Sequence, residues 1–98
     1  MARTPIHPGE ILADELEALG MSASALAKAL HVPANRIAQI VAGKRGMTAD
    51  TALRLSRFLG ATPEFWLNLQ KAYELKLAEQ ESGDAIRRSI EPLASVLE

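Results

Sequence analysis

The sequence contains no cysteine among its 98 residues, so it can build neither a disulfide framework nor a thiolate metal site. It has no apolar run long enough to span a bilayer, and its first residues, MARTPIHPGE, lack the apolar segment of a signal peptide. It also lacks a glycine-rich phosphate loop and a serine or cysteine nucleophile motif. We therefore expect a cytoplasmic protein whose function does not depend on such chemistry.

The length and composition are those of one small globular domain. With 98 residues and 48% hydrophobic content, the chain has room for a single core. Because so short a chain buries limited surface, dimerisation would stabilise it. No alternating apolar–polar run predicts a strand, whereas helical spacing recurs along the chain, so we expect an all-α fold.

Residues 22–45, SASALAKALHVPANRIAQIVAGKR, predict two short helices around a sharp turn. Ser22 can cap the first helix, and Pro33 suits the start of the second because its missing N–H would be unpaired there. Gly43 can end the second helix. The positions expected to face inward are Leu26, Ala27, Leu30, Ile37 and Ile40. This arrangement, over residues 22–43, is typical of a helix-turn-helix.

Three further helices are predicted around this motif. They span about 9–19, from a Thr48 cap to Gly60, and from a Thr62 cap to about Gln80. Their expected inward-facing residues outside the last helix are Leu12, Leu16, Leu19, Ala52, Leu55 and Leu59. Residues 82–84 (Ser-Gly-Asp) break the helical pattern, so helix, strand and disordered tail all stay open for residues 81–98.

Charge is distributed unevenly, although the formal net charge is only −1. Residues 21–60 carry one carboxylate, Asp50, against six cations: Lys28, Arg36, Lys44, Arg45, Arg54 and Arg57. Residues 1–20 and 61–98 are both net acidic. Positive potential is thus concentrated around the helix-turn-helix, which duplex phosphates favour; the alternative is that these cations merely solvate a surface.

Three blocks around the motif narrow its assignment: HPGEIL at 7–12, GKRGMTADTALRL at 43–55 and TPEFWLNLQ at 62–70. The motif resembles the helix-turn-helix of the phage-repressor-like (Cro/C1, XRE) family. With the three blocks, the chain resembles HigA-type antitoxins of bacterial toxin–antitoxin modules over residues 7 to about 80. The resemblance implies a lambda-repressor-like dimer that binds an inverted-repeat operator, represses its own operon and neutralises a HigB-type ribonuclease toxin.

The docking geometry of the motif predicts which side chains would contact DNA. Ile37 and Ile40 face the core, which turns the opposite face of the second motif helix toward the major groove. The predicted base-contacting residues are Ala34, Asn35, Arg36 and Gln39, with Arg36 able to reach a phosphate or a guanine. The predicted phosphate contacts are Ser22, Lys44 and Arg45, with Arg54 as a further candidate. Helix capping is the alternative for Asn35 and plain solvation the alternative for Gln39.

Three positions depart from the family pattern. His31 stands where the turn usually has glycine, so it must adopt a left-handed conformation or reshape the turn. Ala23 replaces a glutamine and Val41 a glutamate that many phage repressors have at these positions. These changes leave the docking mode intact but make the transfer of an operator sequence unsafe.

The last long helix carries more apolar surface than one core contact requires. One stripe, expected to face the core, comprises Phe65, Trp66, Leu69, Tyr73 and Leu77, and a second stripe comprises Leu67, Leu75 and Ala78. Among them, the candidate core or dimer residues are Phe65, Trp66, Leu69, Tyr73 and Leu75. We expect the second stripe to meet a partner.

An enzyme is the alternative from a different functional class. His7, Glu10 and Asp14 could share one side and bind a metal or transfer protons. The Pro8–Gly9 pair disturbs any helical register between them, so we expect no catalysis, metal or cofactor. His7 is interpreted instead as an N-terminal cap or hinge residue.

The sequence therefore predicts a compact five-helix domain over residues 1–80 and a C-terminal extension over 81–98 that dimerises or stays flexible. The predicted partners are operator DNA, a HigB-type toxin and a second copy of the chain. The alternatives are a stand-alone transcriptional repressor and a protein-interaction module that no longer binds DNA. The acidic side chains of the first helix, Glu10, Asp14, Glu15 and Glu17, are candidates for docking the toxin or simply solvate the surface.

Overall fold

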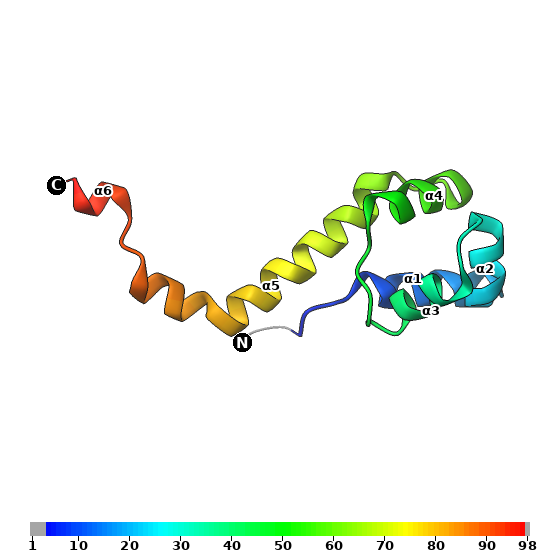
Figure 1. Cartoon of the computed structure of the whole chain (residues 1–98), viewed down its shortest axis with the longest axis horizontal. Coiled ribbons are helices and arrows are strands. Elements are labelled where there is room, and N and C mark those ends of the chain that lie inside the picture. Colours follow the sequence, from blue (N-terminus) through cyan, green and yellow to red (C-terminus); the bar gives the residue numbers. More distant parts are fainter. Residues whose placement is uncertain (1–3, 98) are drawn as a thin grey trace.

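The structure, a computed structural model, describes residues 4–97, which form six helices and no strand (Figure 1). The helices are α1 (Pro8–Leu19), α2 (Ala23–Leu30), α3 (Ala34–Val41), α4 (Ala49–Leu59), α5 (Pro63–Ser89) and α6 (Leu93–Val96). Helices α1–α4 and the start of α5 form a globular body, from which the rest of α5 and α6 project (Figure 1). The predicted all-α fold of five main helices is confirmed, and α6 adds one short turn.

Side-chain caps set the helix starts that the sequence predicted. The hydroxyl oxygens of Ser22, Thr48 and Thr62 each accept a hydrogen bond from the backbone N–H three residues later, at 3.0, 3.4 and 3.2 Å. Gly20 and Gly60 end α1 and α4 in the left-handed conformation that glycine adopts without strain. The helix boundaries inside the body are therefore local consequences of capping chemistry.

The core lies where α1–α4 meet the first turns of α5. Its buried side chains are Leu12, Leu16, Leu26, Ala27, Leu30, Ile37, Ile40, Met47, Ala52, Leu55 and Trp66. All inward-facing positions predicted for the helix-turn-helix are among them. The prediction for Leu19 is wrong: this side chain is half exposed, because it is the last residue of α1 and lies next to the turn at Gly20.

Helices α1 and α3 approach each other backbone to backbone at Gly9. A Cβ atom at this position would lie 1.8 Å from the carbonyl oxygen of Ile40, so only glycine fits. His7 and Glu10, on either side of this position, close the helix start: His7 Nδ1 accepts from the Gly9 N–H at 2.8 Å, and Glu10 accepts from the His7 N–H at 3.0 Å. The interpretation of His7 as an N-terminal cap is confirmed.

Helix α5 continues past the end that the sequence predicted near Gln80. It runs without interruption through residues 82–84 and spans 27 residues. Arg87 pairs with Glu79 at 2.6 Å and with Asp84 at 2.7 Å, so ion pairs bridge the segment that contains the helix breakers. The predicted break was wrong because residues 82–84 are only weakly unfavourable to a helix and good helix formers lie on both sides of them.

The chain leaves α5 only before Pro92, which cannot follow a helical residue without strain. The apolar side chains around α6 are exposed: Ile90, Leu93, Val96 and Leu97. Of the conformations that stayed open for residues 81–98, the described part is mainly helical. The projection makes the molecule 58 Å long and only 24 × 21 Å across. No helix within residues 4–97 has the length and apolar character needed to cross a membrane.

Candidate nucleic-acid interface

Helices α2 and α3 are joined by a turn in which His31 is left-handed. Its φ and ψ are 58° and 46°, and it is the one non-glycine residue between 4 and 97 with a positive φ. The turn is closed by the His31 N–H, which donates to Lys28 O at 3.2 Å, and the Val32 N–H, which donates to Ala27 O at 3.0 Å. Of the two options that the sequence left for His31, the left-handed conformation is the one adopted.

Helix α3 presents a polar face to solvent. Ile37 and Ile40 are fully buried beneath it, whereas Ala34 and Asn35 are exposed and Gln39 is partly exposed. Among the residues that the structure describes, neither the Asn35 nor the Gln39 side chain makes a hydrogen bond. Pro33, not Asn35, is the N-cap of α3. The amide groups of both side chains are therefore available to base edges in a major groove.

A basic turn, residues 42–47, follows α3 and carries Lys44 and Arg45, both exposed. Its first half is fixed to α3, because the Lys44 N–H donates to Gln39 O at 2.8 Å. Its second half is fixed to α5, because the Met47 N–H donates to Gln70 Oε1 at 2.6 Å. The two cations thus stand on a turn held at both ends beside the exposed face of α3.

Ser22 lies at the start of α2, where its hydroxyl oxygen caps the helix. An N-cap hydroxyl keeps its proton, so Ser22 can still donate to a phosphate, and the first amides of α2 point the same way. The structure therefore places Ser22 at a helix end suited to an anion.

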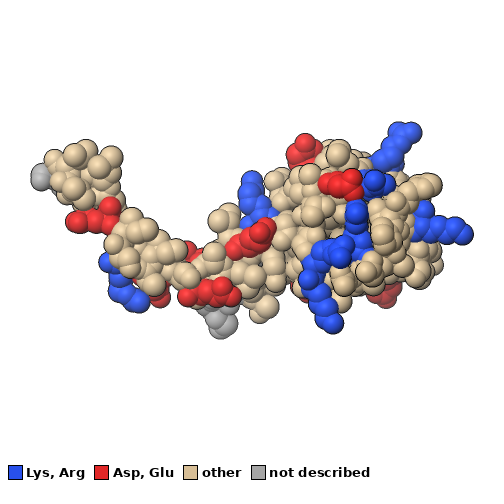
Figure 2. Space-filling model, in the orientation of Figure 1, with Lys and Arg blue, Asp and Glu red and all other residues tan. Residues whose placement is uncertain are grey.

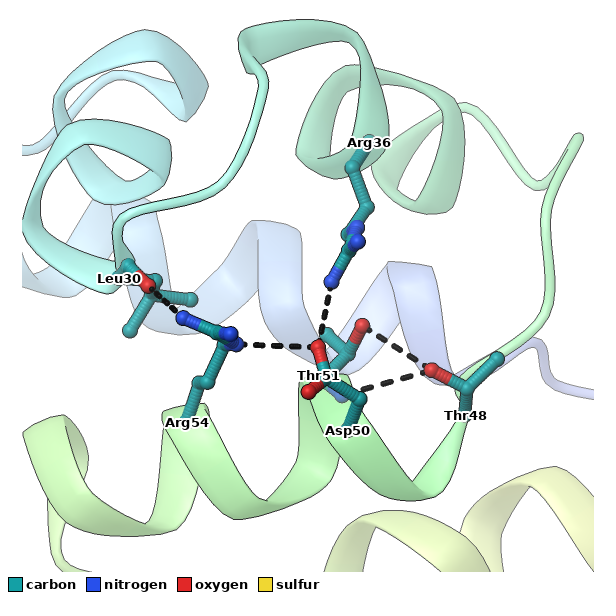
Figure 3. A network of polar contacts seen from close by, with 6 residues as sticks. All are labelled: Leu30, Arg36, Thr48, Asp50, Thr51 and Arg54. Atoms are coloured by element: carbon teal, nitrogen blue, oxygen red, sulfur yellow. Dashed lines mark hydrogen bonds and ion pairs between the residues drawn. The ribbon is translucent and has the colours of Figure 1, made fainter.

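Arg36 is engaged with a carboxylate that the sequence analysis did not assign to the site. Its NH1 atom lies 2.6 Å from Asp50 Oδ2, while Arg54 Nε lies 3.0 Å from the same oxygen (Figure 3). Hydrogen bonds from Arg54 and from Arg36 lower the pKa of Asp50 below its ordinary value of 3.8. Arg54 NH1 also donates to Leu30 O at 2.9 Å, so this network joins α2, α3 and α4. Only the uniqueness of Asp50 within a basic segment could have signalled its role.

Figure 2 shows how charge is divided over the visible face of the molecule. Lysine and arginine side chains extend from the globular body, which also carries acidic side chains, and the projecting part carries side chains of both signs. The basic segment predicted from the sequence corresponds to α2–α4, whereas the acidic residues of α1 belong to the same body. Positive side chains on α2–α4 suit attraction to duplex phosphates.

The candidate core or dimer residues of α5 fall into different environments. Trp66 is 2% exposed, Leu69 packs partly against the core, and Tyr73 meets the His7 ring edge-on with centroids 4.8 Å apart. Leu75 is exposed. Phe65 is exposed as well, so placing it in the core stripe was wrong; the neighbouring Trp66 occupies that side of α5.

The second apolar stripe of α5 lines a groove, which the sequence did not predict. Its members Leu67, Leu75 and Ala78 lie along a hollow of about 530 Å³ whose remaining lining residues are Met47, Gln70, Lys71 and Glu74. Leu67 also packs against the core, so the two stripes are less separate than the sequence indicated. An apolar groove beside the basic turn is left open to solvent.

The acid–base grouping that the sequence raised as an alternative has a structural role. His7 and Glu10 are joined to each other and to Gly9 by the hydrogen bonds of the α1 cap, and the His7 side chain is buried. Asp14 is exposed one turn further along α1. This geometry stabilises a helix start and commits the His7 imidazole to the cap.

The chain matches the Helix-turn-helix family over residues 12–67. It is 61% identical over 77 residues to virulence-associated protein I of Dichelobacter nodosus, an alignment that covers 78% of this chain and 71% of the relative. A HigA-family addiction module antidote protein from Coxiella burnetii is 57% identical, superimposes with a TM-score of 0.90, and is matched over 92% of this chain and 99% of its own. Pseudomonas aeruginosa antitoxin HigA, solved with the higBA promoter, is 48% identical with a TM-score of 0.88, over 91% of this chain and 98% of its own.

The fold, the exposed face of α3 and the basic turn beside it define a helix-turn-helix DNA-binding regulator, which acts by binding and is not an enzyme. Within that class, the chain belongs to the HigA family of antitoxins.

Proposed function

We propose that this chain is the antitoxin of a type II toxin–antitoxin module that binds an inverted-repeat operator as a dimer, represses its own operon and neutralises a HigB-type ribonuclease in the cytoplasm. The observation that carries the proposal is the face of α3, where Asn35 is exposed and Gln39 partly exposed, and neither side-chain amide makes a hydrogen bond to a residue that the structure describes. Membership of the HigA family and the relative solved with the higBA promoter support an operator as the target.

The proposed contacts of Asn35 and Gln39 with base edges are tested by removing each side-chain amide group. Asn35→Ala and Gln39→Ala should each lose about 1–3 kcal/mol of binding free energy for the operator and little for random duplex. Lys44→Ala is the matched control on the basic turn, since losing a phosphate contact weakens binding to every sequence and flattens the salt slope by about one unit. Equal losses on operator and random duplex for Asn35→Ala would contradict its assignment.

The groove on α5 is the proposed dimer contact. A dimer that fills two successive major grooves needs recognition helices about 34 Å apart, which only a second copy held at a fixed angle provides. Leu75 lines the groove and is 64% exposed, so Leu75→Glu should leave folding nearly unchanged while shifting the protein toward monomers. Sedimentation equilibrium measures the shift toward monomers, and operator titration measures the loss of operator affinity that should accompany it. A wild type that stays monomeric at micromolar concentration and binds one half-site would contradict the dimer.

The exposed acids of α1 are the proposed docking groups for the toxin. A ribonuclease handles RNA and should present a basic surface, which exposed carboxylates would attract. Asp14, Glu15 and Glu17 are all exposed, whereas Glu10 is partly committed to the α1 cap. Reversing Asp14 and Glu17 to lysine should slow toxin association and weaken growth rescue, with operator binding equal or slightly stronger. Unchanged toxin binding at low salt would move the contact to α5 or α6.

Co-expression with the adjacent reading frame tests the antitoxin role as a whole. Co-purification of a small basic protein whose toxicity this chain relieves is the expected result. Operator binding without any such partner would instead favour a stand-alone transcriptional repressor.

A further inference from the structure

The network around Asp50 contains the only carboxylate within residues 21–60 of the sequence. Asp50 lies in the first turn of α4, two residues after its Thr48 cap. A small cleft of about 200 Å³, lined by Arg36, Arg45, Thr48, Asp50 and Thr51, connects this network with the basic turn. The carboxylate therefore stands at the edge of the surface that faces DNA in the proposed function.

The carboxylate holds the one cation on the recognition helix. Figure 3 shows the Arg36 side chain reaching from α3 toward α4, where its NH1 atom meets Asp50 Oδ2 at 2.6 Å. Arg54 approaches the same oxygen from the next turn of α4 and is itself anchored to Leu30 O. Asp50 thus fixes Arg36 through one bond, and Arg54 fixes Asp50.

A contribution to folding does not account for this arrangement. The side chains of Arg36 and Asp50 are 29% and 56% exposed, and ion pairs this accessible to water contribute little to stability. Charge matters more for DNA binding than for folding, because each phosphate neutralised by a cation steepens the salt dependence of DNA binding by nearly one unit. Pairing one arginine with a carboxylate on this surface therefore changes DNA binding more than it changes folding.

We propose that Asp50 is a specificity-determining residue: by holding Arg36 against α4 it keeps this cation from binding phosphates of any sequence and leaves discrimination to Asn35 and Gln39. The inference rests on the proposed operator binding. Random duplex is bound mainly through its phosphates, because its base edges do not match Asn35 and Gln39, so a free Arg36 would strengthen binding to it. At the operator, Asn35 and Gln39 already hold α3 against matching base edges, so Arg36, which the sequence predicted as a direct DNA contact, adds less there. The ion pair thus increases the difference in binding affinity between operator and random duplex.

The test is Asp50→Asn, which keeps the side-chain size and removes the charge. We expect affinity for random duplex to rise several-fold, with a salt slope steeper by about one unit. Operator affinity should rise less or fall, so the ratio of the two affinities decreases. Fluorescence anisotropy over a series of salt concentrations measures the affinities for operator and for random duplex. Thermal unfolding checks that the fold is retained.

Two controls separate this role from a general charge effect. Glu81→Gln removes one negative charge from the exposed projecting part of α5 and should leave the affinity ratio unchanged. In an Arg36→Ala background, Asp50→Asn should strengthen random binding much less, because the cation it releases is gone. The inference is overturned if Asp50→Asn leaves the affinity ratio at its wild-type value, or if Glu81→Gln changes the ratio equally. It is also overturned if Asp50→Asn strengthens random binding just as much in the Arg36→Ala background. A wild type without operator preference overturns the proposed function first, and this inference with it.

Discussion

The globular body and the projecting end of α5 use similar apolar residues but cover them differently. In the body, leucines such as Leu12 and Leu55 are completely buried between helices. Across residues 74–97, Gly83 is the one buried residue, and Leu93 and Leu97 are 70% and 75% exposed. The body is therefore stabilised by its own core, whereas the projection is held mainly by helix propensity.

The largest difference is expected from truncating one leucine in each region. Leu55→Ala should destabilise the protein by about 2–5 kcal/mol, because it removes a fully buried side chain and leaves a cavity. Leu93→Ala should change the free energy of unfolding by no more than about 0.5 kcal/mol in the monomer, because this side chain is mostly in water. Urea denaturation of dilute protein measures both. A large loss for Leu93→Ala would mean that the projection is covered even at low concentration.

The two buried glycines should respond with opposite signs. Gly9→Ala places a methyl group 1.8 Å from the Ile40 carbonyl oxygen, which is backbone and cannot yield, so a loss of about 1–3 kcal/mol or more is expected. At Gly83 the nearest neighbour of the added methyl group is the Glu79 carboxylate, the mobile end of a long side chain. Gly83→Ala should therefore raise helicity and gain up to about 1 kcal/mol locally.

Circular dichroism and denaturant unfolding of the two glycine variants provide the comparison. Moving Glu79 also weakens its exposed pair with Arg87, which contributes little. A Gly9→Ala variant as stable as wild type would show that α1 and α3 can separate without cost.

Removing a cap should have an intermediate effect. Thr48→Ala deletes the hydroxyl that accepts from the Thr51 N–H and should cost about 1 kcal/mol of the free energy of unfolding. Thr48→Ser keeps the oxygen and is the control. Helix α6 starts at Pro92 with no side-chain cap, so Pro92→Ala should have no comparable effect on global stability. A loss as large for Thr48→Ser as for Thr48→Ala would assign the effect to packing.

The smallest effect is a pH dependence from Asp50. Its pKa in the folded protein is lowered, first by the hydrogen bond from Arg54 and then by that from Arg36, so its stabilising contribution is present above the unfolded value. The contribution is lost as the pH falls through the folded pKa, below 3.8. The stability difference between wild type and Asp50→Asn should therefore shrink between pH 5 and the acid limit of folding. With Arg36→Ala and Arg54→Ala present, the pH-dependent difference should disappear.

Local chemistry explains which parts of the fold could be predicted from the sequence. Ser22, Thr48 and Thr62 cap helices through atoms three residues away, and Gly20 and Gly60 end helices through their own backbone freedom. Helical spacing likewise placed the buried residues of the helix-turn-helix. These signals need no knowledge of the rest of the molecule, and the structure confirms them.

The parts that could not be predicted depend on contacts distant in sequence. Arg36 and Asp50 are 14 residues apart, and nothing in the local pattern indicates that α3 and α4 bring them together. Phe65 and Trp66 are adjacent large aromatic residues, and only the packing of α5 on the body determines that Trp66 is the buried one. The extent of α5, by contrast, was mispredicted for a local reason, because the helix formers on both sides of residues 82–84 outweigh the breakers there.

The position of Trp66 supplies a built-in optical reporter. It is the only tryptophan in the sequence, it is 2% exposed, and no residue that the structure describes accepts a hydrogen bond from its indole N–H. An indole in so apolar a setting emits at short wavelength and is shielded from dissolved quenchers. Opening of the body should shift that emission to longer wavelength, whereas movement of the projecting end of α5 should leave it unchanged. Intrinsic fluorescence can therefore follow the body alone, without any attached dye.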